Sequence, residues 1–118
     1  MDILISEDDE DVRTVIKLML KRDGVNIQTT SNGLEALNTL KGDDSNFDIL
    51  ITDFNMPKMS GYELVKELFN LNIQLKKIII MSGLFENSED MEALAEKHSN
   101  ISFLFKPISQ EKLLKAVF

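Results

Sequence analysis

Short, fully apolar runs alternate along this chain with amphipathic segments of helical periodicity. Each run is followed by apolar residues at helical spacing, so that strand and helix alternate five times. The expected strands lie at residues 3–5, 25–30, 49–51, 78–81 and 101–105. Alternation of this kind predicts one α/β domain over residues 1–118, in which a parallel sheet is covered by helices on both faces.

The expected helices begin and end at residues that are typical of helix termini. Ser60 and Glu63 have the spacing of a capping box, which predicts a helix from there to about Asn70. Asn87 or Ser88 can cap the following helix. The remaining signals are Ser109 before the last helix, and Gly24 and Gly42 after the first two.

Composition narrows the functional classes. Twenty acidic against thirteen basic residues give a formal charge of −7, which argues against a nucleic-acid surface. The chain has no cysteine and only one histidine, His98, so thiolate and multi-histidine metal sites are excluded. His98 is expected at a helix end, where the dipole favours it. No apolar run approaches the roughly 20 residues that span a membrane. The N-terminus lacks the pattern of a secretory signal, and we expect a cytoplasmic protein.

Polar residues follow four of the predicted strands, at the point where each strand ends. Ligands of open parallel α/β sheets bind beyond these carboxyl ends. The residues concerned are Glu7, Asp8, Asp53, Asn55, Ser82 and Lys106. They are therefore expected to gather at one edge of the sheet.

The acids in this group indicate a cation site. If their strands are neighbours, Glu7, Asp8 and Asp53 lie close enough to repel, which raises their pKa values or requires a cation. Oxygen ligands in a partly open site suit Mg²⁺. The acids at 9–11 are better explained as the first turn of a helix, which the dipole stabilises. For Glu7 and Asp8, that explanation and a metal-binding role both remain open.

The other polar residues also have ordinary explanations. Asp53 suits the start of a turn before Pro57, Lys106 can extend its amine from a strand end, and Ser82 is common in turns. The alternatives are a nucleophile at Asp53, a fixed cation at Lys106, and a hydrogen-bond donor at Ser82. We favour these functions because the residues follow successive strands.

Five segments together resemble the receiver domain of two-component response regulators, over essentially the whole chain. They are residues 3–8, 48–57, 60–61, 80–83 and 105–107. The resemblance implies a flavodoxin-like (βα)5 fold, a three-layer sandwich with strand order 2-1-3-4-5.

The resemblance also implies a role for each matching residue. Asp53 is the expected phosphoacceptor, with Ser82 and Lys106 as its hydroxyl and lysine partners. The expected Mg²⁺ ligands are Asp8 directly, Glu7 through water, Asp53 by a carboxylate oxygen and Asn55 by its backbone carbonyl. Phe103 occupies the aromatic switch position, and the Lys106–Pro107 bond is expected to be cis.

A receiver domain takes a phosphoryl group from the phosphohistidine of a sensor histidine kinase or phosphotransfer protein. It catalyses only its own phosphorylation and dephosphorylation. Ser82 is then expected to pull the loop 83–87, and Phe103 to turn inward. This would change the face formed by the helix after Ser88, the strand 101–105 and the helix after Ser109.

That face would control a downstream effector protein or a fused output domain, and it could pair two copies of the chain. Its candidate contact residues are Met91, Phe103, Phe105 and Phe118. For Met91, a place in the core is an equal alternative.

Three other functions compete with this interpretation. An aspartate-nucleophile phosphatase normally has a second aspartate two residues after the nucleophile, where this chain has Asn55. A nucleotide-binding module would carry a G-x-G-x-x-G turn or a P-loop, and neither is present. A pseudo-receiver that only binds partners would not need the set of Glu7, Asp8, Asp53, Ser82 and Lys106.

Overall fold

The computed structural model describes residues 1–42, 45–83 and 88–118. Five strands alternate with five helices within these residues, as predicted. The elements are β1 (Asp2–Ser6), α1 (Glu10–Leu20), β2 (Asn26–Thr30), α2 (Gly33–Lys41), β3 (Ile49–Asp53), α3 (Gly61–Asn70), β4 (Lys77–Ser82), α4 (Glu89–Lys97), β5 (Ile101–Phe105) and α5 (Gln110–Val117).

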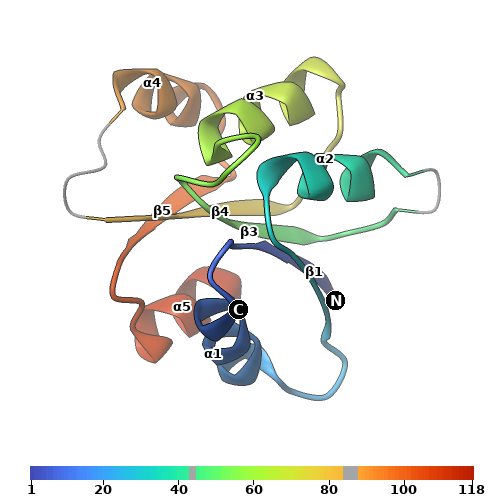
Figure 1. The fold of residues 1–118 in the computed structure, drawn as a ribbon, viewed down its shortest axis with the longest axis vertical. Coiled ribbons are helices and arrows are strands. Elements are labelled where there is room, and N and C mark those ends of the chain that lie inside the picture. The colour runs from blue at the N-terminus through green and yellow to red at the C-terminus, as the bar shows by residue number, and fades with distance from the viewer. Residues whose placement is uncertain (43–44, 84–87) are drawn as a thin grey trace.

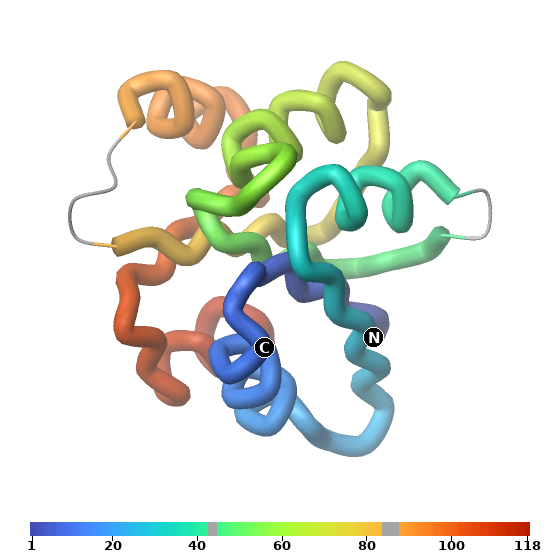
Figure 2. The backbone as a smooth tube through the Cα atoms, in the orientation of Figure 1, coloured from blue at the N-terminus to red at the C-terminus, as the bar shows by residue number. Residues whose placement is uncertain are grey.

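The five strands form one parallel sheet in the order β2-β1-β3-β4-β5, which confirms the predicted topology. Helices α1 and α5 cover one face, and α2, α3 and α4 cover the other (Figure 1). The backbone tube shows the same three layers (Figure 2). In this register Ser6 pairs with Thr52, and Ser82 pairs with Phe105. The carboxyl ends of β1, β3, β4 and β5 therefore lie side by side.

Each face of the sheet has its own hydrophobic core. Ile3 and Ile5 point to the face covered by α1 and α5, whereas Leu4 points to the face covered by α2 to α4. Strands β1, β3 and β4 are buried on both faces, because they lie inside the sheet. Met91 of α4 is only 1% exposed and belongs to the second of these cores. The hypothesis that Met91 contributes to a partner surface is therefore wrong.

Side-chain caps fix where the helices begin. Asp9 caps α1 by accepting from the backbone N–H groups of Asp11 and Val12, as expected for the acids at 9–11. Ser60 and Glu63 form the predicted capping box of α3. The N-caps of the last two helices are Ser88 and Ser109. The alternative cap, Asn87, lies outside the described residues.

The ends of the chain are tied to the fold. The Met1 ammonium donates to the Gly24 carbonyl at 2.8 Å, in the turn before β2. Gly24 has φ of +80°, so it serves this turn and not the end of α1, which is capped at Lys21. At the other terminus, the Arg22 guanidinium lies 3.7 Å above the Phe118 ring. None of the described helices combines the length and apolar character that a membrane span needs.

Candidate functional site

Three carboxylates meet at the carboxyl edge of the sheet. Asp53 is the last residue of β3, and Glu7 follows β1, the strand paired beside it. One carboxylate oxygen from each of Glu7, Asp8 and Asp53 lies within 4.8 Å of the others. Glu7 and Asp53 are buried, whereas Asp8 is exposed. The cluster is thus enclosed on the sheet side and open towards Asp8.

Lys106 supplies a positive charge to this cluster. Its Nζ lies 3.0 Å from Asp53 Oδ1 and 3.6 Å from Glu7 Oε1. The Lys106 backbone N–H donates to the Ser82 carbonyl at 2.7 Å, which fixes the start of this side chain beside β4. The Lys106–Pro107 bond is cis, as expected. Lys106 therefore faces Asp53 from the side opposite Asp8 in the sheet order.

Burial, and then the neighbouring Asp53 carboxylate, disfavour the charged form of Glu7. Burial and this carboxylate raise the pKa of Glu7 to about 8, although Lys106 acts in the opposite direction. Within the described residues, no group donates a hydrogen bond to the buried Glu7 Oε2. The single positive charge of Lys106 thus only partly neutralises the carboxylates of the cluster.

A divalent cation would complete this balance. The available ligands are carboxylate oxygens from Glu7, Asp8 and Asp53, which are the hard donors that Mg²⁺ prefers. Glu7 Oε2 has no hydrogen-bond partner among the described residues and Asp8 is exposed, so both carboxylates have oxygens available to a cation. Asn55 lies exposed in the loop after Asp53. The residues present therefore fit a Mg²⁺ site.

The two predicted switch residues lie on neighbouring strands. Ser82 ends β4 and is buried, and Phe103 of β5 packs, partly buried, against the core under α2 to α4. The expected movement of Ser82 falls on a loop whose residues 84–87 lie outside the described part. Phe105, two residues after Phe103, is 65% exposed.

A profile of the response regulator receiver domain matches residues 3–118. The chain belongs to this family. It is therefore a receiver domain of two-component systems, and the fold and sheet order agree with that assignment.

Similar proteins support the assignment. The cell cycle response regulator CtrA of Brucella ovis is 32% identical over 117 residues, which cover 99% of this chain and 48% of CtrA. The receiver domain therefore spans about half the length of the curated relatives it matches.

Solved structures give the same result. A response regulator receiver domain protein from Clostridium thermocellum is 29% identical, with a TM-score of 0.79, over 98% of this chain and 89% of that one. The chemotaxis protein CheY4 of Vibrio cholerae is 28% identical, with a TM-score of 0.78, over 98% of this chain and 94% of CheY4.

Sequence reasoning missed several residues that shape the receiver domain's site. The Met56 sulfur lies 3.1 Å from the Ser6 hydroxyl and 3.8 Å from that of Thr52, just beneath the cluster. Arg13 of α1 donates to the Glu7 carbonyl at 2.7 Å. The one signal in the sequence was the cation at position 13, in a helix turn whose dipole disfavours it. Met56 reads as an ordinary loop residue.

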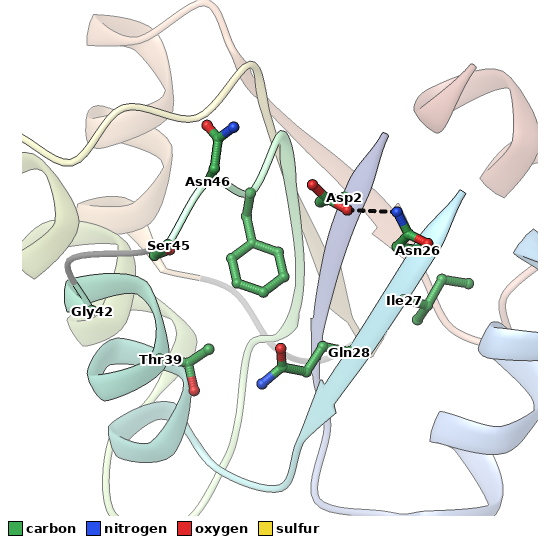
Figure 3. Close-up of a pocket in the computed structure, with 9 residues that line it drawn as sticks. Asp2, Asn26, Ile27, Gln28, Thr39, Gly42, Ser45 and Asn46 are labelled. Carbon is green, nitrogen blue, oxygen red and sulfur yellow. Dashed lines mark hydrogen bonds between the residues drawn. The ribbon is translucent and has the colours of Figure 1, made fainter. Parts of the chain in front are cut away.

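A separate pocket of about 530 Å³ lies at the other end of the sheet, between β2 and the segment before β3 (Figure 3). Polar side chains such as Gln28, Thr39 and Asn46 line it, and Asn26 donates to Asp2 at its rim. None of the clustered acids lines this pocket.

Proposed function

We propose that the receiver domain accepts a phosphoryl group on Asp53 from the phosphohistidine of a sensor histidine kinase or phosphotransfer protein, in a reaction that requires Mg²⁺. The observation that supports this most directly is the meeting of Asp53 with Glu7, Asp8 and Lys106 at one edge of the sheet. The proposed Mg²⁺ ligands are Glu7, Asp8, Asp53 and the backbone carbonyl of Asn55.

The chemistry is a transfer between two covalent carriers. A carboxylate oxygen of Asp53 attacks phosphorus, and the bond between phosphorus and the histidine nitrogen breaks. The nitrogen keeps the bonding electrons, and the imidazole leaves in its neutral form because its other ring nitrogen already carries a proton. Asp53 then carries an acyl phosphate, which water later hydrolyses to restore the carboxylate and release inorganic phosphate. Mg²⁺, when bound, would neutralise charge on the transferring oxygens.

Lys106 and Ser82 serve the transferring group in this proposal. The Lys106 ammonium, 3.0 Å from Asp53 Oδ1, would pair with a phosphoryl oxygen once Asp53 is modified. The Ser82 hydroxyl, at the end of the adjacent strand, would donate to another. Ser82 comes before α4 in the chain, and Lys106 lies between β5 and α5. A change at the site would therefore reach the surface that α4, β5 and α5 form at this edge of the sheet, called here the α4/β5/α5 face.

An apolar groove beside the site offers the donor protein a place to bind. It has a volume of about 320 Å³ and lies between α1 and the residues that follow Lys106. Val12, Val15, Pro107 and Ile108 are among its lining residues. A partner seated there would hold its phosphohistidine near Asp53, because Lys106 belongs to both the groove and the site.

The downstream partner is proposed to bind the α4/β5/α5 face. Phe105 is exposed there, on the edge strand β5. An effector protein or a fused output domain would read this face, with Phe103 as the residue that changes between states.

Labelling by a small phosphodonor tests the proposal. The chain is incubated with acetyl phosphate, with and without Mg²⁺, and intact-protein mass spectrometry counts the added phosphoryl groups. We expect one group on the wild type, dependent on Mg²⁺, and labelling at background in Asp53→Asn. The matched control is Asp23→Asn, the same substitution at an exposed aspartate outside the cluster, which should label as the wild type does.

Two outcomes would reject the proposal. Asp53→Asn that labels at the wild-type level would move the acceptor elsewhere. Continuous turnover of small phosphate esters would instead favour a phosphatase, in which the phosphorylated form does not persist as a signal.

A further inference from the structure

The two peptide groups that flank Glu7 are each held by a hydrogen bond. The Glu7 N–H donates to the Thr30 carbonyl at the end of β2, at 3.1 Å. The Glu7 carbonyl accepts from Arg13 Nη1, which reaches back from α1, at 2.7 Å. A guanidinium bond of this length is charge-assisted and stronger than one between neutral groups. The first residue of the acidic loop is thus held by β2 on one side and by α1 on the other.

Arg13 makes this bond in surroundings that would lead one to expect a different partner. The acids at 7–11 precede it in sequence, yet within the described ranges Arg13 forms no ion pair with any carboxylate. It also lies in the first turn of α1, where the helix dipole disfavours a cation. The guanidinium therefore acts as a hydrogen-bond donor to the backbone, and not as a counter-charge.

The peptide group that joins Glu7 to Asp8 contains the carbonyl held by Arg13, and its orientation decides where the Asp8 carboxylate lies. Asp8 is exposed, and one of its carboxylate oxygens lies within 4.8 Å of those of Glu7 and Asp53. On its C-terminal side, Asp9 is anchored as the N-cap of α1. On its N-terminal side, the bond between Arg13 and the Glu7 carbonyl is the corresponding anchor. Asp8 is thus held between two fixed neighbours.

We propose that Arg13 is a positioning residue for the cation site: by holding the Glu7 carbonyl, it aims the Asp8 carboxylate at the position of Mg²⁺. The inference rests on the proposed Mg²⁺-dependent function and adds a residue that touches neither the metal nor the phosphoryl group. Residues that orient metal ligands in this way typically change metal affinity by roughly 10- to 100-fold when they are replaced.

Charge and positioning make opposite predictions for Arg13. If its charge were all that mattered, replacing it by methionine would remove repulsion and tighten Mg²⁺ binding. If it positions Asp8, the same replacement weakens binding. Lysine separates the two further, because it keeps the charge but its amine ends one bond short of the arginine Nη1.

The test is calorimetric titration of the full chain with Mg²⁺ alone, for the wild type, Arg13→Met and Arg13→Lys. Lys17→Met is the control, since it removes an exposed cation one turn further along α1. We expect the Mg²⁺ dissociation constant to rise roughly tenfold or more in both Arg13 variants and to stay unchanged or fall in Lys17→Met. Urea unfolding without Mg²⁺ measures the stability of each variant separately.

An Arg13→Met protein that binds Mg²⁺ as tightly as the wild type, or more tightly, overturns the inference, as does a loss of stability without a loss of affinity. If Arg13→Met does not fold, Arg13→Lys decides by the same criterion. Asp53→Asn distinguishes a failure of the proposed function from a failure of the role of Arg13. A wild type that binds no Mg²⁺, or binds it equally after Asp53→Asn, contradicts the proposed function itself. A wild type that needs Asp53 but not Arg13 contradicts only the role of Arg13.

Discussion

Gly61 begins α3 directly against the strand end that carries Asp53. A Cβ at this position would overlap the Asp53 carbonyl oxygen and lie 3.1 Å from the Phe54 Cα. The Gly61 N–H also donates to the Phe54 carbonyl at 2.8 Å, so the backbone cannot move away without losing this bond. The absence of a side chain at Gly61 therefore lets α3 pack beside Asp53.

We expect Gly61→Ala to lower the free energy of unfolding by about 1–3 kcal/mol, because the methyl group forces α3 away from β3. Urea unfolding of the two proteins measures the difference. Gly42→Ala is the control: its backbone has φ of −60°, and among the described residues an added Cβ would meet only the Thr39 carbonyl oxygen, at 3.4 Å. It should change stability by less than about 1 kcal/mol. Equal effects of both substitutions would contradict the close approach at Gly61.

At the scale of elements, α1 serves two surfaces. Ile16 and Leu20 are buried in the core beneath it. Val15 lies at the groove beside the site and is 49% exposed. The sequence predicted only the first of these surfaces, because apolar residues at helical spacing indicate a stripe that faces the core. The second surface becomes visible only when the residues after Lys106 lie next to it.

Val15→Lys should slow phosphotransfer from a purified sensor kinase roughly tenfold, equivalent to about 1.4 kcal/mol of lost contact, and leave labelling by acetyl phosphate unchanged. The reason is that, in the proposed complex, the donor protein covers Val15, whereas a small donor would reach Asp53 without touching α1. Leu34→Lys is the matched control, since Leu34 is exposed on α2, across the sheet. Parallel loss of both kinds of labelling in Val15→Lys would mean that the substitution damages the site and not the docking groove.

At the scale of the whole molecule, the two edges of the sheet treat their acids in opposite ways. At the carboxyl edge, Glu7 and Asp53 are crowded. At the amino edge, the Asp48 carboxylate accepts from the Asp2 N–H at 2.8 Å and lies 3.3 Å from Lys76 Nζ. The Asp2 N–H and then Lys76 hold the pKa of Asp48 below its ordinary value. The Asp48 carboxylate is thus paired at the amino edge, whereas the carboxylates of Glu7, Asp8 and Asp53 crowd together at the carboxyl edge.

This predicts a pH-dependent stability difference between the wild type and Asp48→Asn. A lowered pKa in the folded protein means that the ionised form stabilises the fold above the ordinary value near 3.9, and that this contribution is lost as pH falls through the lowered pKa. Urea midpoints of the two proteins should therefore differ at pH 7 and converge in acid. Lys76→Met should give a smaller difference, because the Asp2 N–H is the larger cause. A gap that stays constant down to the acid range would contradict this account.

Much of the site could be read from strand ends. Once the order of elements was known, parallel pairing required Glu7, Asp53, Ser82 and Lys106 to approach one edge, and the structure brings them there. The capping box at Ser60 was equally readable, because its signal spans four residues. Met91 was not, since a partly apolar helix fits a core position and a surface position equally well until its neighbours are known.

The sequence by itself determined the periodicity of the strands and helices, the helix caps and the residues that follow each strand. These features depend only on residue types and spacings within one turn or one strand. Folding alone decided which distant groups touch. The 3.0 Å approach of Lys106 to Asp53, the burial that raises the pKa of Glu7 and the bond from Arg13 to the Glu7 carbonyl all join different elements. Such distances depend on how whole strands and helices pack. The residues next to a side chain in the sequence do not determine that packing.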